Sequence, residues 1–347
     1  METLFPIDGG AILVRPDIEA LVVIRSTTSV ETLPEGLAMP DGAIEERSDR
    51  SAVAAYPPLR LEGAVRWEIG LRFLGKAIRI RNRLAEVDIG LRRRIAHLAE
   101  DLGAEGLGEE HVIDFDLTAD RGSYTLWKNG RILFTTSNPD ELAGEVCNTL
   151  LTVAVAPQQV ALFVHAAGLV IDGATMMLCA PSGGGKTTLA LGLAASGATL
   201  LTDDTVAIVK DDFSVVGLPV ALRVRASGWP VVERLLSFPA AAGDPSPRGI
   251  RHIPPRVVGE TRQRALPAAV VVALFYRAGA DCDWQPLDAA SGLAAVIAAG
   301  AVLPSIPDAA VARTLGQWCQ RTRFVSLTYG SLEDGIRAVH AIGTERS

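Results

Sequence analysis

Cysteine is scarce in this sequence, and the cysteines present are far apart. They are Cys147, Cys179, Cys282 and Cys319, and they form no C-x-x-C pair. Disulfide scaffolds and thiolate metal sites depend on closely spaced cysteines. The pattern therefore disfavours a disulfide framework or a cysteine metal site. It suits a reducing compartment, and we expect a cytoplasmic protein.

An excess of positive charge is also lacking. The 347 residues include 33 Lys and Arg against 40 Asp and Glu, a net charge of −7. This balance argues against nucleic acid or an anionic membrane as a partner bound through bulk electrostatics. The 48% of apolar residues can fill a substantial core, enough for two domains or one large one.

Long hydrophobic runs with the character of a membrane span are absent as well. The first eight residues carry an acidic residue, Glu2, next to Met1 and have neither a basic segment nor a continuous apolar core, so we expect no signal peptide. The longest uncharged run, 289–307, is rich in Ala and Gly and contains Pro304 and Pro307. It predicts a buried helix rather than a span.

The clearest motif is a glycine loop between a predicted strand, 175–179, and a predicted helix that ends at Gly197. It resembles the phosphate-binding consensus G-x-x-x-x-G-K-[ST], with Ala180 in place of the first glycine. Its glycines let backbone N–H groups turn toward a polyphosphate, Lys186 offers a charge to the terminal phosphates, and Thr187 offers a hydroxyl to Mg²⁺. The alternative is a glycine-rich turn with a purely structural role.

The part of the chain before this core shows mixed patterns. They are short strands at 11–14 and 21–24, a polar loop at 27–50, an alternating strand at 65–73, a helix at 88–102 that stops at Gly103, and a hairpin at 124–134 turning at Asn129-Gly130. We expect residues 1–137 to form a small α+β domain with a role in substrate recognition or packing. A helix capped by Ser137 or Asn138 opens the second domain, 138–347.

Two aspartates, Asp203 and Asp204, follow the strand 198–202, seventeen residues after Lys186. Carboxylates at the carboxyl end of such a strand are expected beside the phosphate loop, where one can hold Mg²⁺ and the other can accept a proton. Neighbouring strand residues point to opposite faces, so the two should have different roles, and the sequence leaves the assignment open. A second pair, Asp211-Asp212, reads as a turn.

His165 lies on an apolar strand, where a lone histidine is more often a core residue than a catalytic one. However, Val164-His165-Ala166, the glycine loop and the run 200–204 resemble the nucleotide-binding core of HPr kinase/phosphorylase in order and separation. The resemblance is clear over roughly 163–209 and looser through 221–223 and 251–255. It does not extend before about residue 158.

The resemblance implies an α/β protein with a P-loop kinase core of the HPr kinase and phosphoenolpyruvate carboxykinase type, preceded by the small α+β domain. It implies a serine kinase with ATP and Mg²⁺ as cofactors. His165 would line the reaction site, Thr187 with Asp203 or Asp204 would bind the metal, and the remaining aspartate would be the base. The residues implied to bind the ATP phosphates are Ser182, Gly183, Gly184, Gly185, Lys186, Thr187 and Thr188.

The chain also departs from that family. Its front domain does not resemble theirs, and it lacks the glycine-rich stretch that follows their catalytic core. It resembles instead the HPr-kinase-related proteins, a group that includes kinases of lasso-peptide precursors. The expected partner is thus a peptide or small protein carrying a serine, with homo-oligomerisation left open. A small-molecule kinase and a non-catalytic nucleotide-dependent sensor or assembly protein are the alternatives.

One further basic loop, 248–256, could clamp the transferring phosphoryl group or could simply be solvated. Arg251 is its best catalytic candidate because the resemblance resumes there, and Arg223 is a weaker one. The run 270–276 predicts a buried strand and 332–342 a terminal helix, and we assign chemistry to neither.

Overall fold

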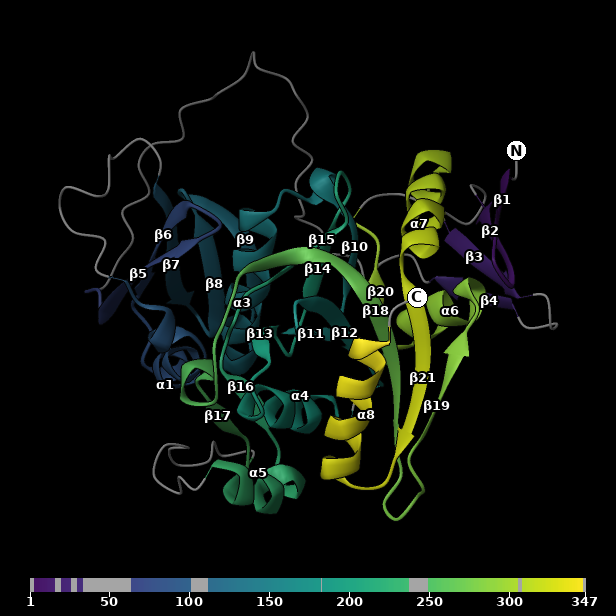
Figure 1. The fold of residues 1–347 in the computed structure, drawn as a ribbon. Coiled ribbons are helices and arrows are strands. Elements are labelled where there is room, and N and C mark those ends of the chain that lie inside the picture. Colours follow the sequence, from purple (N-terminus) through teal and green to yellow (C-terminus); the bar gives the residue numbers. More distant parts are fainter. Residues whose placement is uncertain are drawn as a thin grey trace. The chain divides into compact units, whose positions relative to one another are not determined.

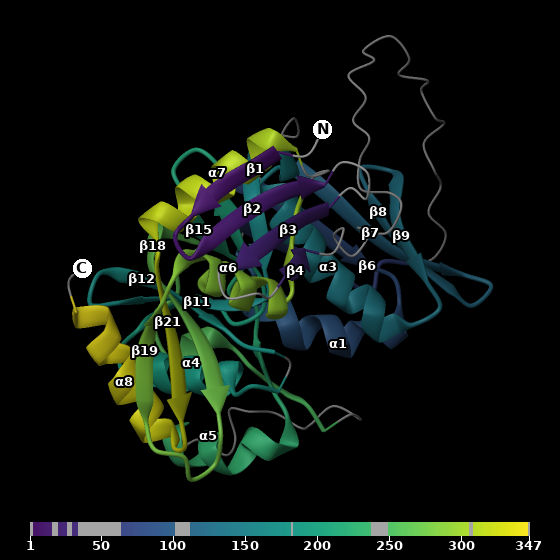
Figure 2. The same ribbon diagram turned by 90° about the vertical axis from the view of Figure 1, so that its right-hand side faces the viewer.

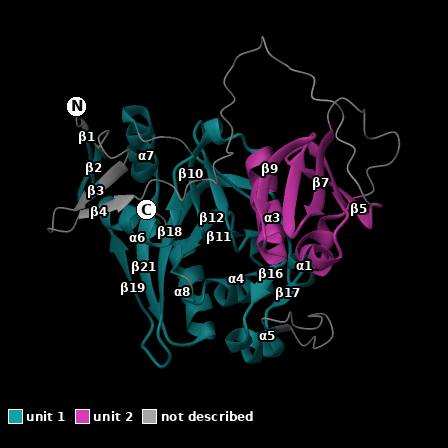
Figure 3. Ribbon diagram, turned by 180° about the vertical axis from the view of Figure 1, so that it is seen from behind, with its two compact units in different colours: residues 1–36, 155–347 teal, residues 37–154 magenta. Residues whose placement is uncertain are grey.

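The computed structural model describes residues 3–15, 20–25, 30–33, 64–100, 112–181, 183–236, 249–304 and 308–345 of the chain. The chain divides into two compact units, which Figure 3 colours separately. Unit 1 comprises Met1–Gly36 and Val155–Ser347, and unit 2 comprises Leu37–Ala154. None of the helices in the described ranges combines the length and apolar character that crossing a bilayer requires.

This division differs from the predicted boundary between 137 and 138. The antiparallel strands β1 (Thr3–Ile7), β2 (Gly10–Arg15), β3 (Ala20–Arg25) and β4 (Val30–Leu33) belong to unit 1. Their buried side chains, such as Ile12 and Val23, join the core formed with Leu293 and Trp318. Burial against elements distant in sequence therefore decides which unit these strands join, and a linear boundary could not capture it. The polar loop predicted at 27–50 is wrong at 30–33, which is strand β4, and 27–29 and 34–50 lie outside the described residues.

Unit 2 is built on one five-stranded sheet in the order β5-β6-β7-β8-β9, with helices α1 and α3 packed together beside it. The elements in its described residues are β5 (Trp67–Phe73), β6 (Lys76–Asn82), α1 (Ala85–Ile95), a short 3-10 turn (Ala96–Leu98), β7 (Val112–Asp120), β8 (Ser123–Lys128), β9 (Arg131–Thr136) and α3 (Pro139–Ala154).

Four predictions for unit 2 can be compared with this structure. The hairpin turn is confirmed, since Asn129 and Gly130 have φ angles of 49° and 76°. The cap at Asn138 is confirmed, since its Oδ1 accepts a hydrogen bond from the Asp140 N–H at 3.0 Å. The helix predicted over 88–102 begins earlier and ends at Ile95, while 101–103 lies outside the described residues. Helix α3 belongs to unit 2 rather than to the following domain.

Unit 1 contains the large sheet, in the order β13-β11-β12-β18-β15-β14-β10-β20 with β21 and then β19 added beside β18. The strands are β10 (Val160–Val164), β11 (Ala166–Ile171), β12 (Ala174–Cys179), β13 (Thr199–Thr202), β14 (Val206–Val209), β15 (Ser214–Gly217), β18 (Arg264–Tyr276), β19 (Asp283–Leu287), β20 (Ala301–Val302) and β21 (Arg323–Tyr329).

The described residues of unit 1 also form a smaller sheet, five helices, and 3-10 turns at Pro157–Gln159, Ala226–Gly228 and Pro255–Val257. The small sheet pairs β16 (Leu222–Val224) with β17 (Arg251–Ile253). The helices are α4 (Lys186–Ala195), α5 (Trp229–Leu236), α6 (Ala289–Ala298), α7 (Ala309–Arg321) and α8 (Leu332–Thr344).

Helices cover both faces of the large sheet (Figures 1 and 2). Along β12, Met176 and Leu178 pack into the core shared with α4 and α8, whereas Met177 and Cys179 pack into the core shared with α6 and α7. A sheet buried on both sides requires continuous apolar strands, which explains the unbroken apolar run of β12. The buried helix expected within 289–307 is confirmed as α6.

Candidate functional site

The glycine loop lies where the sequence predicts it, between the end of β12 at Cys179 and the start of α4 at Lys186. Gly183 and Gly185 have φ angles of 86° and 83°, a region that favours glycine. A Cβ on Gly184 would lie 2.8 Å from the Ala180 side chain. Alanine therefore fits at the first consensus position because residue 184 is a glycine. Ser182 lies outside the described residues.

Lys186 is buried at the first turn of α4 and reaches across to His165, which lies between β10 and β11. Its Nζ donates a hydrogen bond to the backbone carbonyl of His165 at 2.8 Å. Burial lowers the pKa of Lys186, and the nearby thiol of Cys179 and carboxylates of Asp203 and Asp204 offset part of that shift. The ammonium group thus joins the glycine loop to the junction between β10 and β11.

Asp203 follows β13 directly and is only 5% exposed. Burial, reinforced by the negative charge of Asp204, raises the pKa of Asp203 to about 6. A hydrogen bond with the Thr187 side chain and the charge of Lys186 hold it from rising further. The hydroxyl and the carboxylate predicted to share a metal ion therefore lie side by side.

Asp204 has different partners. Its Oδ1 lies 3.4 Å from Nδ1 of His165, and its side chain is 37% exposed. Burial acts to raise the pKa of Asp204, but the hydrogen bond and charge of His165, with the charge of Arg223, outweigh it and lower the pKa. His165 itself is not a core residue, since its side chain is 44% exposed and lines the same cavity.

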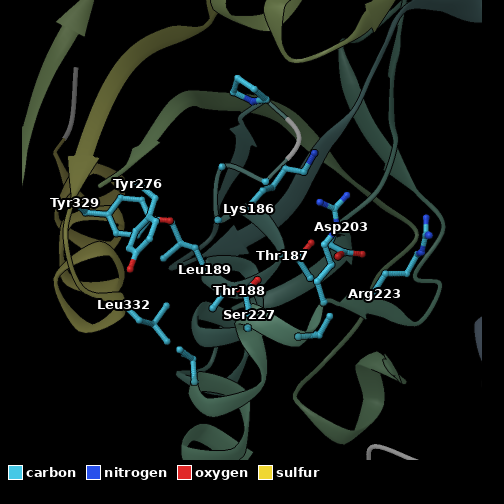
Figure 4. A pocket seen from close by; sticks show the side chains of 18 of the residues that line it. Lys186, Thr187, Thr188, Leu189, Asp203, Arg223, Ser227, Tyr276, Tyr329 and Leu332 are labelled. Atoms are coloured by element: carbon cyan, nitrogen blue, oxygen red, sulfur yellow. The ribbon is translucent and has the colours of Figure 1, made fainter. Parts of the chain in front are cut away.

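These residues line one cavity of about 570 Å³ (Figure 4). It contains every described residue that the sequence analysis assigned to phosphate or metal binding, together with His165. Residues not predicted for the site also line it, and they come from the segment after β16, from α5, from the carboxyl ends of β18 and β21 and from the start of α8. They include Arg225, Ser227, Arg234, Tyr276, Tyr329, Leu332 and Glu333. The end of strand 270–276 and the start of helix 332–342, to which the sequence analysis assigned no chemistry, therefore contribute to the lining of this cavity.

The prediction for Arg251 is not supported by its placement. Its guanidinium carbon lies 3.4 Å from the ring centroid of Trp229, and its Nη1 lies 3.4 Å from Oε1 of Glu233. Within the described chain, Arg251 is not among the residues that line the cavity, whereas Arg223 is. In the pairing of β16 with β17, Arg251 lies opposite Val224 and Arg223 lies opposite His252. The arginine beside the carboxylates is thus Arg223, the weaker of the two candidates.

The donor set fits a magnesium ion that also binds phosphate. Among the described residues, no group of three or more His, Cys, Asp or Glu side chains forms a metal site by itself. The Thr187 hydroxyl and the Asp203 carboxylate, with Asp204 next to them, supply hard oxygen donors. Mg²⁺ is commonly held by one or two carboxylates and completes its shell with water and substrate phosphates. Such an ion therefore requires only part of its coordination shell from the protein, as found here.

Comparisons with known proteins add little to this geometry. No family model matches the sequence, and no curated protein matches it. Among solved structures, the chain is similar to the Hpr(Ser) kinase/phosphatase from Coxiella burnetii, with a TM-score of 0.26 and 11% sequence identity. That match covers 52% of this chain and 96% of the other. The similarity is distant, and at this TM-score no conclusion about fold or activity rests on it.

Proposed function

We propose that the protein is a Mg²⁺-dependent kinase that transfers the γ-phosphoryl group of ATP to a serine hydroxyl of a peptide or small protein. One observation carries the proposal. The glycine loop, a buried lysine and two carboxylates in unlike environments line a single cavity. Phosphoryl transfer needs this combination, because catalysis consists mainly of positioning and charge stabilisation.

The residues take separate roles. Backbone N–H groups of residues 183–188 and the Lys186 ammonium bind the phosphates. Thr187 and Asp203 would hold Mg²⁺, which supplies charge neutralisation on the phosphate oxygens when bound. Arg223, beside Asp204, stabilises negative charge on the transferring group.

Asp204 is the proposed general base. His165 orients its carboxylate toward the cavity, and its lowered pKa keeps it ionised at neutral pH. The acceptor oxygen forms a bond to the γ-phosphorus while the bond from that phosphorus to the β–γ bridging oxygen breaks. The hydroxyl proton moves to Asp204, and ADP leaves with the bridging oxygen. The choice of serine rests on the sequence resemblance.

Labelled ATP tests this proposal directly. The protein, its Asp204→Asn variant and the products of neighbouring genes are incubated with γ-labelled ATP and Mg²⁺, and phosphoserine is located by mass spectrometry. Label in a protein or peptide, absent with the variant, supports the peptide kinase. Label only in metabolites indicates the small-molecule kinase, whereas ATP binding without any transfer indicates the sensor. Either of those two results overturns the proposal.

A further inference from the structure

Three neighbouring strands of the large sheet run parallel and end at the same edge. β12 pairs with β18, and β18 pairs with β21, both in parallel register. The glycine loop follows β12, Tyr276 ends β18 and Tyr329 ends β21. Ligands of open α/β sheets bind at the carboxyl ends of the strands, so both tyrosines lie where a ligand of the loop would extend.

The two tyrosines differ in exposure, and both approach Gly185. Their ring centroids are 5.4 Å apart with the planes tilted by 56°. Tyr329 is buried, and its hydroxyl lies 2.7 Å from the place that a Cβ on Gly185 would occupy. Tyr276 is 47% exposed. Tyr329 therefore supports both the loop and its neighbour, while the ring of Tyr276 remains accessible.

The position of these rings relative to the carboxylates sets the direction of a bound nucleotide. In Figure 4, Tyr276, Tyr329 and Leu332 lie on one side of the glycine loop, Asp203 and Arg223 lie on the other, and Thr187 lies between. On the proposed function, the γ-phosphate is at the carboxylate side. A triphosphate lying along the loop then directs its α-phosphate, and the nucleoside attached to it, toward the tyrosines.

We infer that the exposed ring of Tyr276 is the stacking surface for the nucleobase, with Tyr329 holding that ring in place and Leu332 supplying an apolar flank. Among the described residues that line the cavity, Tyr276 and Tyr329 carry the six-membered aromatic rings, whereas the imidazole of His165 lies beside Asp204. Stacking on an aromatic side chain is available to every nucleobase because each has a π-face. The inference rests on the proposed function. It adds a contact to the nucleobase, which the phosphate loop does not bind.

A comparison of two ligands tests the inference. ATP and inorganic tripolyphosphate are titrated calorimetrically, with Mg²⁺, into the wild type and into Tyr276→Ala, Tyr276→Phe and Phe275→Ala. Phe275 is a matched control, since it precedes Tyr276 on β18, is 45% exposed, and is not among the described residues that line the cavity. Tyr276→Ala should weaken ATP binding about tenfold to a hundredfold and leave tripolyphosphate binding unchanged. Tyr276→Phe should retain ATP affinity, and Phe275→Ala should alter neither ligand.

The possible outcomes separate this inference from the proposed function. If wild-type protein binds both ligands and Tyr276→Ala does not change ATP affinity, the stacking role is wrong while the phosphate site stands. An equal loss for both ligands also overturns it, because the substitution has then damaged the loop rather than a base contact. If wild-type protein binds neither ligand, the proposed function fails, and the stacking role fails with it.

Discussion

Two aspartate pairs in unit 1 have nearly the same local sequence setting and opposite structural settings. Asp203-Asp204 follows β13, and Asp211-Asp212 follows β14, and each of these strands is four buried residues long. Asp203 is 5% exposed inside the cavity, whereas the side chain of Asp212 is 51% exposed. The dipeptide therefore does not determine its own role, which depends on what surrounds the end of the strand.

The electrostatic environments of the pairs differ in the same way. Burial raises the pKa of Asp203 to about 6. For Asp212, burial acts to raise the pKa, but the hydrogen bonds from Ser214 and Arg264 and the charge of Arg264 together outweigh it, and the pKa is lowered. The surroundings thus stabilise the charged form of Asp212. They destabilise the charged form of Asp203, and a bound cation would remove this destabilisation. Such a perturbed carboxylate in a cavity is typical of a functional site.

The largest expected difference between the pairs is in activity. Asp204→Asn removes the proton acceptor and should lower kcat about 10²-fold to 10⁴-fold. Asp212→Asn, at the other pair, should leave kcat unchanged within about twofold, because exposed turn residues rarely matter to distant chemistry. Steady-state phosphoryl transfer with an identified acceptor measures both. Equal losses in the two variants would abolish the distinction drawn between the pairs.

A substitution in the cavity pair should raise the stability of the ligand-free protein, whereas one in the turn pair should lower it. Asp203→Asn removes a buried charge whose pKa is shifted from 3.8 to about 6, which corresponds to at most about 3 kcal/mol. The ligand-free variant should therefore be more stable than wild type at neutral pH, with a Tm higher by several degrees. Asp212→Asn breaks the contacts with Ser214 and Arg264 and should be slightly destabilising. Calorimetry without nucleotide compares them, and a lower Tm for Asp203→Asn would contradict the burial cost.

The free-energy cost of burying the charged Asp203 carboxylate should depend on pH. Because folding raises the pKa of Asp203, the folded state binds this proton more tightly than the unfolded state. The stabilisation from the neutral carboxyl is complete below pH 3.8 and is lost as pH rises through about 6. The stability gain of Asp203→Asn over wild type should thus grow between about pH 4 and 6 and stay constant above. Denaturant titrations across this range measure it, and a pH-independent difference would rule out this origin.

Substitution of the arginines beside the two pairs should give the smallest difference in kcat. Arg223→Ala removes a charge next to Asp204 and the transferring group, and kcat should fall about tenfold to a hundredfold. Arg264→Ala removes the partner of Asp212, and Arg251→Ala removes the cation stacked on Trp229. Neither should change kcat by more than about twofold. A larger loss from Arg251→Ala than from Arg223→Ala would restore the role predicted from the sequence.

Local features of the fold and site could be predicted because their causes are local. The glycine loop between β12 and α4, the buried helix α6 and the turn at Asn129 each follow from residues adjacent in sequence. His165 is different, because a lone histidine on an apolar strand carries no signal by itself. Its place beside Asp204 came from the resemblance in spacing and is a tertiary contact.

Features that depend on pairing between distant strands could not be predicted. The choice between Arg223 and Arg251 follows from the register of β16 with β17, which the sequence does not reveal. Tyr276 reaches the cavity because β18 runs parallel to β12, and its residue type alone suggests only a strand end. The strands β1 and β2 join unit 1 through a core shared with α6 and α7, far along the chain.

The most direct test of the contrast between the aspartate pairs is ATP binding as a function of Mg²⁺ concentration. Calorimetric titrations compare wild type, Asp203→Asn and Asp212→Asn. We predict that wild type and Asp212→Asn bind ATP with the same dependence on Mg²⁺, and that Asp203→Asn needs at least about tenfold more Mg²⁺ for the same affinity. An identical Mg²⁺ dependence in Asp203→Asn and Asp212→Asn would contradict the assignment of the cavity pair to a metal–nucleotide site.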